Sequence, residues 1–252
     1  MTEAAVHAAL CWSTIGCAIL VLAVLCLVTA PYGRHSRGGW GPTIGATPGW
    51  ILMEAPAPLG MALLFALGEA RSAPVIACLV LFEAHYLHRA FVFPWRRRGA
   101  GRPVPLVIVA FGFVFNCLNA YLNGRWLFHL APPLGATWLL DPRFLGGAGL
   151  YILGLAVNLH ADEVLRRLRP AGADGYAVPR GGLFRFVSSP NYLGEIVEWS
   201  GWALLTWSLP GAAFAVSTVA NLGPRALAHH AWYRRTFPDY PAERKALIPF
   251  VL

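Results

Sequence analysis

Long apolar stretches alternate with short polar or basic segments along the whole chain. The pattern predicts helices at about residues 6–30, 50–68, 73–93, 104–123, 144–165, 191–208 and 211–235. Crossing the hydrocarbon core of a bilayer takes about 20 helical residues, and the predicted helices are close to that length. We therefore expect an all-α integral membrane protein with seven transmembrane helices, forming a single domain over residues 1–252.

Basic residues are distributed unevenly over the segments that connect these helices. Of the 20 lysines and arginines, fifteen fall on one side of a seven-helix topology, three on the other side and two within helices. Because positively charged loops stay in the cytoplasm, this bias predicts an external N-terminus and a cytoplasmic C-terminus. No basic residue precedes the first apolar run, which is longer than the ~7–15 apolar residues of a signal peptide. We expect that run to be retained as the first span.

The composition agrees with a membrane protein and excludes several other classes. Hydrophobic residues make up 57% of the chain and charged residues only 13%, against about 25% charged residues in soluble domains. The net charge of +8 is divided among separate loops, so no continuous basic face for nucleic acid is predicted. The five cysteines all lie in apolar runs and the histidines show no metal-ligand spacing. Neither a disulfide framework nor a metal site is expected.

Ionisable and strongly polar residues interrupt the apolar stretches. An ionisable side chain in hydrocarbon costs from about 2.5 kcal/mol upward, so such residues are expected to face a polar interior. Those that stand in mid-helix are Glu54, Glu83, Arg89, Asn158, Asp162, Glu195 and Glu198.

Helical spacing places many polar residues on shared faces, because positions three or four apart are neighbours on a helix. Taken singly, each has an ordinary explanation, such as a solvated rim charge at Asp162 or a dipole-stabilised carboxylate at Glu195. Taken together they predict a large polar ligand that enters from the cytoplasm. The groups are Asn158, Asp162, Arg166 and Arg169; Asn191, Glu195 and Glu198; Arg225, His229 and Tyr233; and Glu83, Tyr86 and Arg89.

The arginines near the cytoplasmic end of these faces suit phosphate, which a guanidinium binds bidentately. A phosphorylated cofactor is therefore expected. The chain has no GxGxxG after a predicted strand and no GxxxxGK[ST], which excludes the soluble nucleotide-binding folds that depend on those motifs.

Four segments resemble the steroid 5α-reductase family, and the resemblance runs from about Trp50 to Leu252. The segments are HYLHRAFVFP (His85–Pro94), NLHADEVLRRLR (Asn158–Arg169), GGLFRFVSSPNYLGEIVEWSGWALLTWSLP (Gly181–Pro210) and PDYPAERKALIPF (Pro238–Phe250).

The resemblance implies NADPH-dependent reduction of the carbon 4–5 double bond of 3-oxo-Δ4 steroids. It implies that Glu54 and Tyr86 act catalytically by holding the 3-keto oxygen, and Trp50 and Met53 complete the predicted substrate site. Burial in an apolar site favours a neutral carboxyl group, so we expect a protonated Glu54 that can donate. Residues 1–125 then form the substrate side and residues 144–252 mainly the cofactor side. The implied NADPH-binding residues are Arg89, Arg102, Asn158, Asp162, Arg169, Tyr176, Asn191, Glu195, Arg225, His229 and Tyr233.

Two positions depart from the family pattern. Met53 stands where eukaryotic members carry Gln before the Glu, which could alter polarisation of the ketone or the range of substrates. Ala177 stands where they carry Arg after the loop Tyr, which could shift phosphate anchoring onto Arg180 or Arg169.

Other functions remain open at the level of the sequence. A trans-2-enoyl thioester reductase or a sterol double-bond reductase would use the same fold with another substrate. A membrane methyltransferase that uses S-adenosylmethionine has a distantly similar C-terminal region, and a lipid-binding protein or transporter would need no catalysis. The expected partners are a hydrophobic enone and the bilayer, with no nucleic acid and no obligatory protein partner. Short loops rich in Ala, Gly and Arg favour a bacterial inner membrane, or the endoplasmic reticulum for a eukaryotic source.

Overall fold

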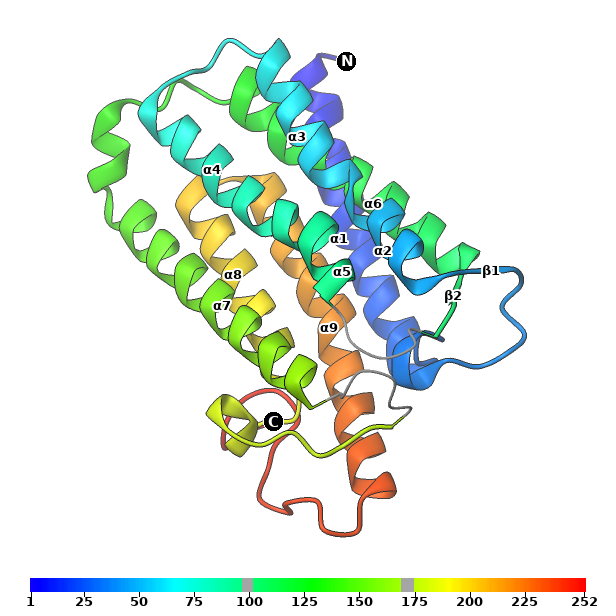
Figure 1. Ribbon diagram of the computed structural model, residues 1–252. Coiled ribbons are helices and arrows are strands. Elements are labelled where there is room, and N and C mark those ends of the chain that lie inside the picture. The colour runs from blue at the N-terminus through cyan, green and yellow to red at the C-terminus, as the bar shows by residue number, and fades with distance from the viewer. Residues whose placement is uncertain (97–101, 169–174) are drawn as a thin grey trace.

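The computed structural model describes residues 1–96, 102–168 and 175–252, and in these ranges the chain is a bundle of long helices (Figure 1). A short antiparallel pair of strands, β1 (Thr43–Ile44) and β2 (Val104–Pro105), lies at one end of the bundle. The helices are α1 (Glu3–Leu27), α2 (Ala46–Glu54), α3 (Pro56–Leu67), α4 (Ala73–Leu87), α5 (Phe93–Arg96), α6 (Leu106–Arg125), α7 (Pro142–Arg167), α8 (Pro190–Thr206) and α9 (Leu209–Thr236).

Shorter helical turns complete these elements. Two π-helical turns, His88–Val92 and Trp126–Leu130, join α4 to α5 and extend α6. The 3₁₀ turns in the described ranges are Gly33–His35, Ala136–Leu140 and Gly182–Arg185.

Each predicted helix coincides with a helical rod in the described part of the chain, and two rods combine shorter elements, α2 with α3 and α4 with α5. The chain termini lie at opposite ends of the bundle (Figure 1). Five of these helical stretches are long and apolar enough to cross a membrane, as an integral membrane protein requires. They are Glu3–Leu27, Ala46–Leu67, Ala73–Arg96, Leu106–Leu130 and Pro142–Arg167. Helix α8 has only 17 residues, and α9 carries Arg234 and Arg235 in its last turn.

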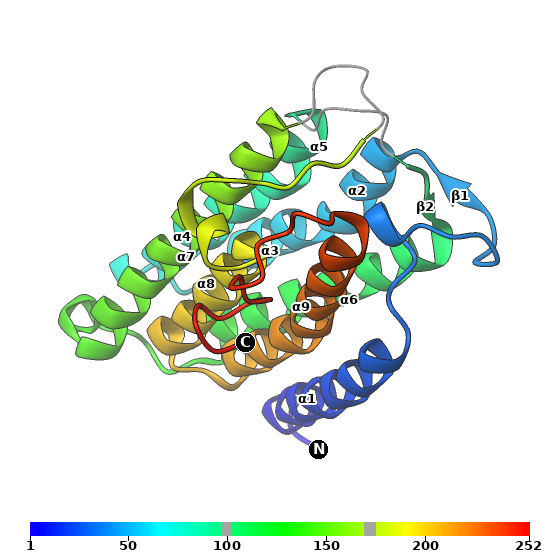
Figure 2. The same ribbon diagram turned by 90° about the horizontal axis from the view of Figure 1, so that it is seen from below.

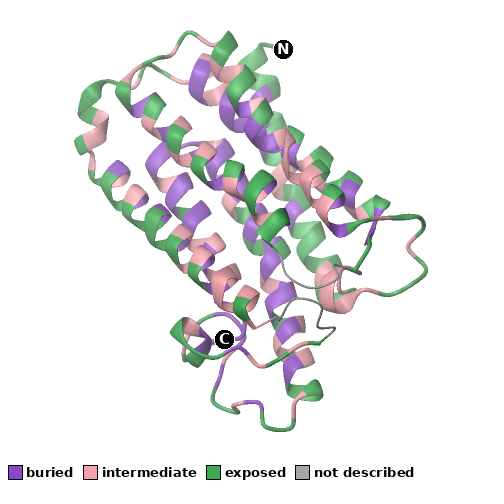
Figure 3. Ribbon diagram, in the orientation of Figure 1, coloured by how far each residue is buried: buried purple, intermediate pink, exposed green. Residues whose placement is uncertain are grey.

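The rods differ in how much of their surface the bundle buries (Figure 3). Helix α1 packs on α9 at the edge of the bundle (Figure 2) and buries only His7, Cys11 and Ala18. The core lies among α3, α4, the end of α6, α7, α8 and α9, where Trp199 and Trp202 are fully enclosed. The exposed apolar side chains on the outer faces are those that a bilayer would cover.

Helices α7 and α8 approach more closely than ordinary side chains permit. A methyl group added at Gly154 would lie 2.3 Å from the backbone nitrogen of Glu198, and one at Gly201 would lie 2.5 Å from that of Tyr151. Small residues let helix backbones approach closely in this way. The contact brings the polar residues of α7 and α8 together, and Figure 2 shows the two helices side by side.

Sequence features at the helix ends agree with the local structure. Asp141 caps α7 by accepting from the backbone N–H of Arg143 at 2.8 Å, and its hydrogen bonds with Arg143 lower the Asp141 pKa to about 2. Pro190 is the first residue of α8, a position where proline is favoured. Trp207 and Ser208 connect α8 to α9, and Pro210 belongs to the first turn of α9.

Two helix irregularities fall beside the predicted catalytic residues. Pro56 starts a new helix two residues after Glu54, and the π-helical turn His88–Val92 begins two residues after Tyr86. Such turns are frequent at functional sites because they redirect side chains within a helix. Here the π-helical turn carries Arg89.

Candidate active site

Glu54 and Tyr86, from α2 and α4, are joined through Asn116 of α6. The Asn116 side-chain nitrogen donates to the Met53 carbonyl oxygen at 2.8 Å and to Glu54 Oε2 at 3.2 Å. The Tyr86 hydroxyl donates to Asn116 Oδ1 at 3.3 Å. The predicted pair therefore shares one hydrogen-bonded network, and Asn116 determines how the carboxyl and phenol groups lie relative to each other.

The network continues from Tyr86 into the core along one face of α6. Asn119 Nδ2 donates to the Tyr86 hydroxyl oxygen at 3.2 Å, and Asn123 Nδ2 donates to Asn119 Oδ1 at 2.9 Å. The indole nitrogen of Trp202 donates to Asn123 Oδ1 at 2.8 Å. All four side chains are at most 4% exposed, so bulk water does not compete for these bonds.

A second buried pair lies next to Tyr86. His85 Nδ1 and Glu198 Oε1 are 2.8 Å apart, and the Glu198 side chain is fully enclosed. Trp199 packs against both His85 and Tyr86, with ring centroids 4.7 and 5.5 Å apart. The pair ties α4 to α8 directly behind the Tyr86 ring.

Met53, the residue that departs from the family pattern, packs against α6. A methyl group added at Gly112 would overlap the Met53 side chain, with its Cγ 2.1 Å away. Met53 also joins the small apolar cluster of Ala46, Val104 and Val109. The apolar thioether thus occupies a space that only a glycine at 112 leaves open.

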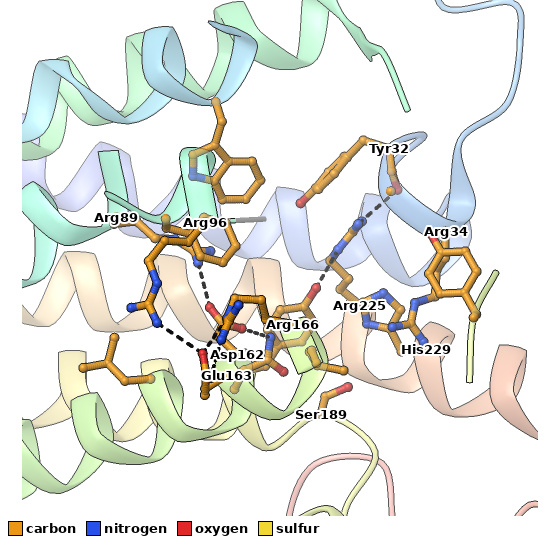
Figure 4. Close-up of a pocket in the computed structure, with 18 of the residues that line it drawn as sticks. Tyr32, Arg34, Arg89, Arg96, Asp162, Glu163, Arg166, Ser189, Arg225 and His229 are labelled. Carbon is orange, nitrogen blue, oxygen red and sulfur yellow. Dashed lines mark hydrogen bonds and ion pairs between the residues drawn. The ribbon is translucent and has the colours of Figure 1, made fainter. Parts of the chain in front are cut away.

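A cavity of about 360 Å³ opens where α7 ends and α8 begins (Figure 4). Its wall combines arginines, aromatic rings and acidic groups from α2, the π-helical turn, α5, α7, α8, α9 and the segment after α1. The lining includes Tyr32, Arg34, Trp50, Arg89, Arg96, Arg102, Asp162, Tyr176, Asn191, Tyr192, Arg225 and His229.

Arg89 occupies the inner wall of this cavity. Its guanidinium lies 3.4 Å from Asp162 and 3.8 Å from Glu195. It also stacks over the Trp50 and Phe93 rings at 4.7 and 4.6 Å. Arg89 follows Tyr86 by three residues, about one helical turn, so this side chain links the cavity wall to the helical rod that carries Tyr86.

Helices α7 and α8 contribute a short chain of amide contacts. Asn158 donates to the Asn191 carbonyl oxygen at 3.0 Å, and Asn191 donates to Asp162 Oδ1 at 3.3 Å. Asn158 is buried behind the cavity wall, whereas Asn191 and Asp162 line it. The close glycine contact between the two helices makes these bonds possible.

Arg225 of α9 is held by the segment that follows α1. Its nitrogens donate to the Tyr32 carbonyl at 3.2 Å, as Figure 4 shows, and to the Tyr192 hydroxyl at 3.0 Å. The Tyr32 ring lies 3.6 Å from the guanidinium carbon. Burial, only partly offset by the Arg225 charge, raises the pKa of Tyr32. Tyr32 is therefore a neutral wall group that can donate or accept.

Arg34 and His35 lie in an aromatic cluster at the outer side of the cavity. The Arg34 guanidinium stands 4.4 Å from the Tyr233 ring centre, and His35 stacks on His229 at 5.1 Å. Burial, with the nearby charge of Arg225 next in effect, lowers the pKa of His35 to about 4. Further charged groups that face His35 are Arg34, Arg37 and Arg235.

Arg34 Nη1 and His35 Nε2 are buried and have no hydrogen-bond partner among the described residues. Buried polar groups are normally satisfied. Arg34 lines the cavity and His35 does not, so an anionic ligand in the cavity would meet that requirement for Arg34.

The structure brings most of the predicted cofactor residues to this cavity. Arg89, Arg102, Asp162, Tyr176, Asn191, Arg225 and His229 line it. Three more predicted residues contact lining residues from behind. Asn158 contacts Asn191, Glu195 contacts Arg89, and Tyr233 contacts Arg34. Arg169 lies outside the described residues. Arg180 lines a separate cavity with Arg185 and Arg244, which shares no lining residue with this one.

Of the predicted substrate residues, Trp50 lines the cavity, whereas Glu54, Met53 and Tyr86 do not. The sequence reasoning missed Asn116, Asn119 and Asn123, although their spacing of three and four residues placed them on one helix face. It also missed Tyr32, Arg34, His35 and Tyr192 as site residues. The first three follow the end of α1, where no helical spacing is available as a signal.

The arrangement can hold a phosphorylated ligand beside a hydrogen-bonding carboxyl and phenol. Comparisons with known proteins show which family the chain resembles. The family described as 3-oxo-5-alpha-steroid 4-dehydrogenase matches residues 102–252. The 3-oxo-5-alpha-steroid 4-dehydrogenase 1 of Bos taurus is 42% identical over 240 residues, 93% of this chain and 92% of the relative.

Two further relatives are similar over nearly the same length. The human 3-oxo-5-alpha-steroid 4-dehydrogenase 1 is 43% identical over 87% of this chain and 85% of its own. The steroid 5-alpha-reductase DET2 of Gossypium hirsutum is 44% identical over 90% of each chain. The similarity thus extends over both the cavity and the network around Tyr86.

Proposed function

Because the chain belongs to the 3-oxo-5-alpha-steroid 4-dehydrogenase family and is an oxidoreductase of that type, we propose that it reduces the carbon 4–5 double bond of 3-oxo-Δ4 steroids with NADPH. The observation that carries the proposal is the Glu54, Asn116 and Tyr86 network. It places two potential hydrogen-bond donors to a ketone within one buried polar group, next to a cavity rich in arginine.

The cavity residues fit NADPH. Its arginines can bind phosphate oxygens bidentately, and its aromatic rings can stack on an adenine or nicotinamide. The unpaired Arg34 Nη1 supplies a donor that a phosphate would satisfy. The cavity of about 360 Å³ falls in the usual range of small-molecule sites, about 300–1,000 Å³.

We assign the cofactor to Arg34, Arg89, Asn191, Arg225 and His229, with Asp162 and Tyr176 beside them. NADPH, when bound, supplies the hydride that reduces carbon 5. Arg169 is expected to contact the 2′-phosphate. Arg169→Ala should therefore weaken the binding of NADPH more than that of NADH, and equal weakening would reject this assignment.

The protein's own contribution is to polarise the ketone. The Tyr86 hydroxyl donates to the 3-keto oxygen, and Glu54, in its protonated form, donates to the same oxygen. Both groups stabilise negative charge that develops on that oxygen during reduction, and one preorganised donor of this kind is worth roughly 3–4 kcal/mol. Trp50 and Met53 provide apolar surface beside Glu54.

The finer topology belongs to this proposal as well. We infer that α8 and α9 also cross the bilayer, giving seven spans with an external N-terminus and a cytoplasmic C-terminus, in a bacterial inner membrane. Residues 1–125 then supply mainly the substrate side and residues 144–252 mainly the NADPH side. The basic residues of the intervening segments support this orientation.

The test is a turnover assay on the purified protein in detergent. We expect it to oxidise NADPH with testosterone or progesterone and to give the 5α-reduced product, with little activity on an enoyl-CoA. Tyr86→Phe should lower kcat about 100-fold or more and leave NADPH binding unchanged. Preference for the enoyl-CoA would reject the steroid assignment, and unchanged turnover of Tyr86→Phe would remove that residue from the chemistry.

A further inference from the structure

The asparagines of α6 lie in a row that ends on an indole of α8, and we propose that Asn119, Asn123 and Trp202 are positioning residues that orient the Tyr86 hydroxyl as a hydrogen-bond donor to the ketone. The inference rests on the proposed function and adds to it how the phenol proton is directed. The three residues do not touch the proposed substrate and act through Tyr86.

The direction of the row is fixed at its inner end. An indole N–H can only donate, so the Asn123 atom 2.8 Å from Trp202 Nε1 must be its oxygen. Asn123 therefore presents its NH₂ group to Asn119, at 2.9 Å from Oδ1. Asn119 in turn presents its NH₂ group to the Tyr86 oxygen, at 3.2 Å. The phenol accepts from Asn119 and cannot donate in that direction.

The outer end of the network fixes the same direction independently. A backbone carbonyl can only accept, so the Asn116 atom 2.8 Å from the Met53 carbonyl must be its nitrogen. Asn116 Oδ1 therefore faces Tyr86 and takes its proton at 3.3 Å. The two ends agree, and every hydrogen bond from Trp202 to Glu54 runs the same way.

This polarity matters for a ketone because the phenol proton is already held on the side away from Asn119. The Tyr86 to Asn116 distance of 3.3 Å exceeds the usual 2.5–3.0 Å of an O–H···O bond. A carbonyl oxygen can replace Asn116 as acceptor at little cost, without reorganising the row behind it. Aligned hydrogen bonds also polarise one another in a buried setting, which strengthens Tyr86 as a donor.

Burial makes the arrangement stable against flipping. Asn119, Asn123 and Trp202 are 3%, 1% and 0% exposed, so a flipped amide would leave unpaired groups with no solvent to satisfy them. If the indole N–H is removed, Asn123 keeps its bond to the Asn119 backbone carbonyl at 3.2 Å, but its buried Oδ1 has no donor, so turning the amide no longer costs the indole bond. Asn123 and Asn119 can then turn, and Asn119 can present an oxygen that draws the phenol proton away from the ketone.

The experiment compares Trp202→Phe with a matched control, Trp138→Phe. Trp138 also donates an indole hydrogen bond, to the Leu205 carbonyl at 3.0 Å, but does not touch the row. We expect Trp202→Phe to lower kcat about tenfold, less than the roughly 100-fold loss of a direct oxyanion donor. The KM for the steroid should change less than about twofold, and Trp138→Phe should keep the wild-type kcat.

A double-mutant cycle separates this role from a general loss of packing. In a Tyr86→Phe background, Trp202→Phe should have no further effect on kcat, because the group through which it acts is gone. Equal losses of kcat with and without the Tyr86 hydroxyl would overturn the proposal. If Trp202→Phe does not fold, Asn123→Leu, which has a similar shape and no polar atoms, breaks the same row and is tested in the same cycle.

An infrared measurement keeps this proposal distinct from the proposed function. The ring C–O stretching band of Tyr86, isolated by labelled tyrosine and subtraction of the Tyr86→Phe spectrum, reports whether the phenol donates or accepts. It should shift in Trp202→Phe and stay in place in Trp138→Phe, whatever substrate the enzyme reduces. An unshifted band in Trp202→Phe would refute the positioning role of Asn119, Asn123 and Trp202. Absence of steroid turnover by the wild type would refute only the proposed function.

Discussion

The contact between α7 and α8 offers a sharp test of how the site is assembled, through Gly154→Ala. The added methyl group would lie 2.3 Å from Glu198 N and 2.5 Å from Gly194 O, about 1 Å inside ordinary contact distance. Backbone atoms cannot rotate away, so the two helices must separate. Gly149 of the same helix, with nothing within 4 Å of its added methyl group, provides the matched control.

The two substitutions should change stability in opposite directions. In a helix, Gly→Ala by itself gains about 1 kcal/mol, which is the whole effect expected for Gly149→Ala. Overpacking costs about 1–3 kcal/mol, and contact with backbone puts Gly154→Ala at the upper end. Its net loss is then about 2 kcal/mol, and a fall in Tm of roughly 4–8 °C follows at this chain length.

Separating the helices should also weaken cofactor binding. Asn158 reaches the Asn191 carbonyl at 3.0 Å, and Glu198 holds His85 at 2.8 Å. The first contact joins α7 to α8 directly, and the second depends on the position of α8. The assays are thermal unfolding in detergent, followed by tryptophan fluorescence, and NADPH titration. If Gly154→Ala were as stable as Gly149→Ala and bound NADPH equally well, the close contact would not be what assembles this side of the site.

Three further predictions concern single side chains. Glu54→Gln keeps a donor to the ketone, so its kcat should fall less than that of Glu54→Ala; equal losses would argue against a donating Glu54. Arg34→Gln should raise the Kd for NADPH about tenfold. The control is Arg71→Gln, because Arg71 stacks 4.0 Å over Phe65, away from the cavity; it should leave that Kd unchanged. The depressed pKa of His35, about 4, means that the unfolded chain binds a proton between about pH 6.5 and 4 that the folded chain does not. Tm should therefore decrease across that window as the pH falls, and decrease less in His35→Phe; parallel curves would contradict the assignment.

The bundle was predictable from sequence because hydrocarbon imposes a simple rule. Each apolar stretch of sufficient length must form a helix, and the predicted stretches correspond to the helical rods of the structure. Helical spacing also identified residues that meet, since Arg89 after α4 and Asn191 on α8 both contact Asp162 on α7. In each case a charge or amide in an apolar helix was the signal.

The rest of the site depended on information that helix periodicity does not carry. Arg34 and His35 follow the end of α1, and only the fold places them against His229 and Tyr233. The α6 asparagines had a usable spacing, but an uncharged amide is a weaker sign of a polar interior than a carboxylate. Their role depends on Trp202, a partner 79 residues beyond Asn123, which no local pattern indicates.

Arg89 explains why a site divided between two regions can act as one. Tyr86 and Glu54 do not line the cavity, yet Arg89, which does, lies one turn beyond Tyr86 on the same helical rod. Asp162, Glu195 and the Trp50 ring hold its guanidinium from the cofactor side. In the proposed function, a bound phosphate would compete with Asp162 and Glu195 for this guanidinium. Arg89 would then transmit cofactor binding to the helical rod that carries Tyr86, because it stands in the π-helical turn of that rod.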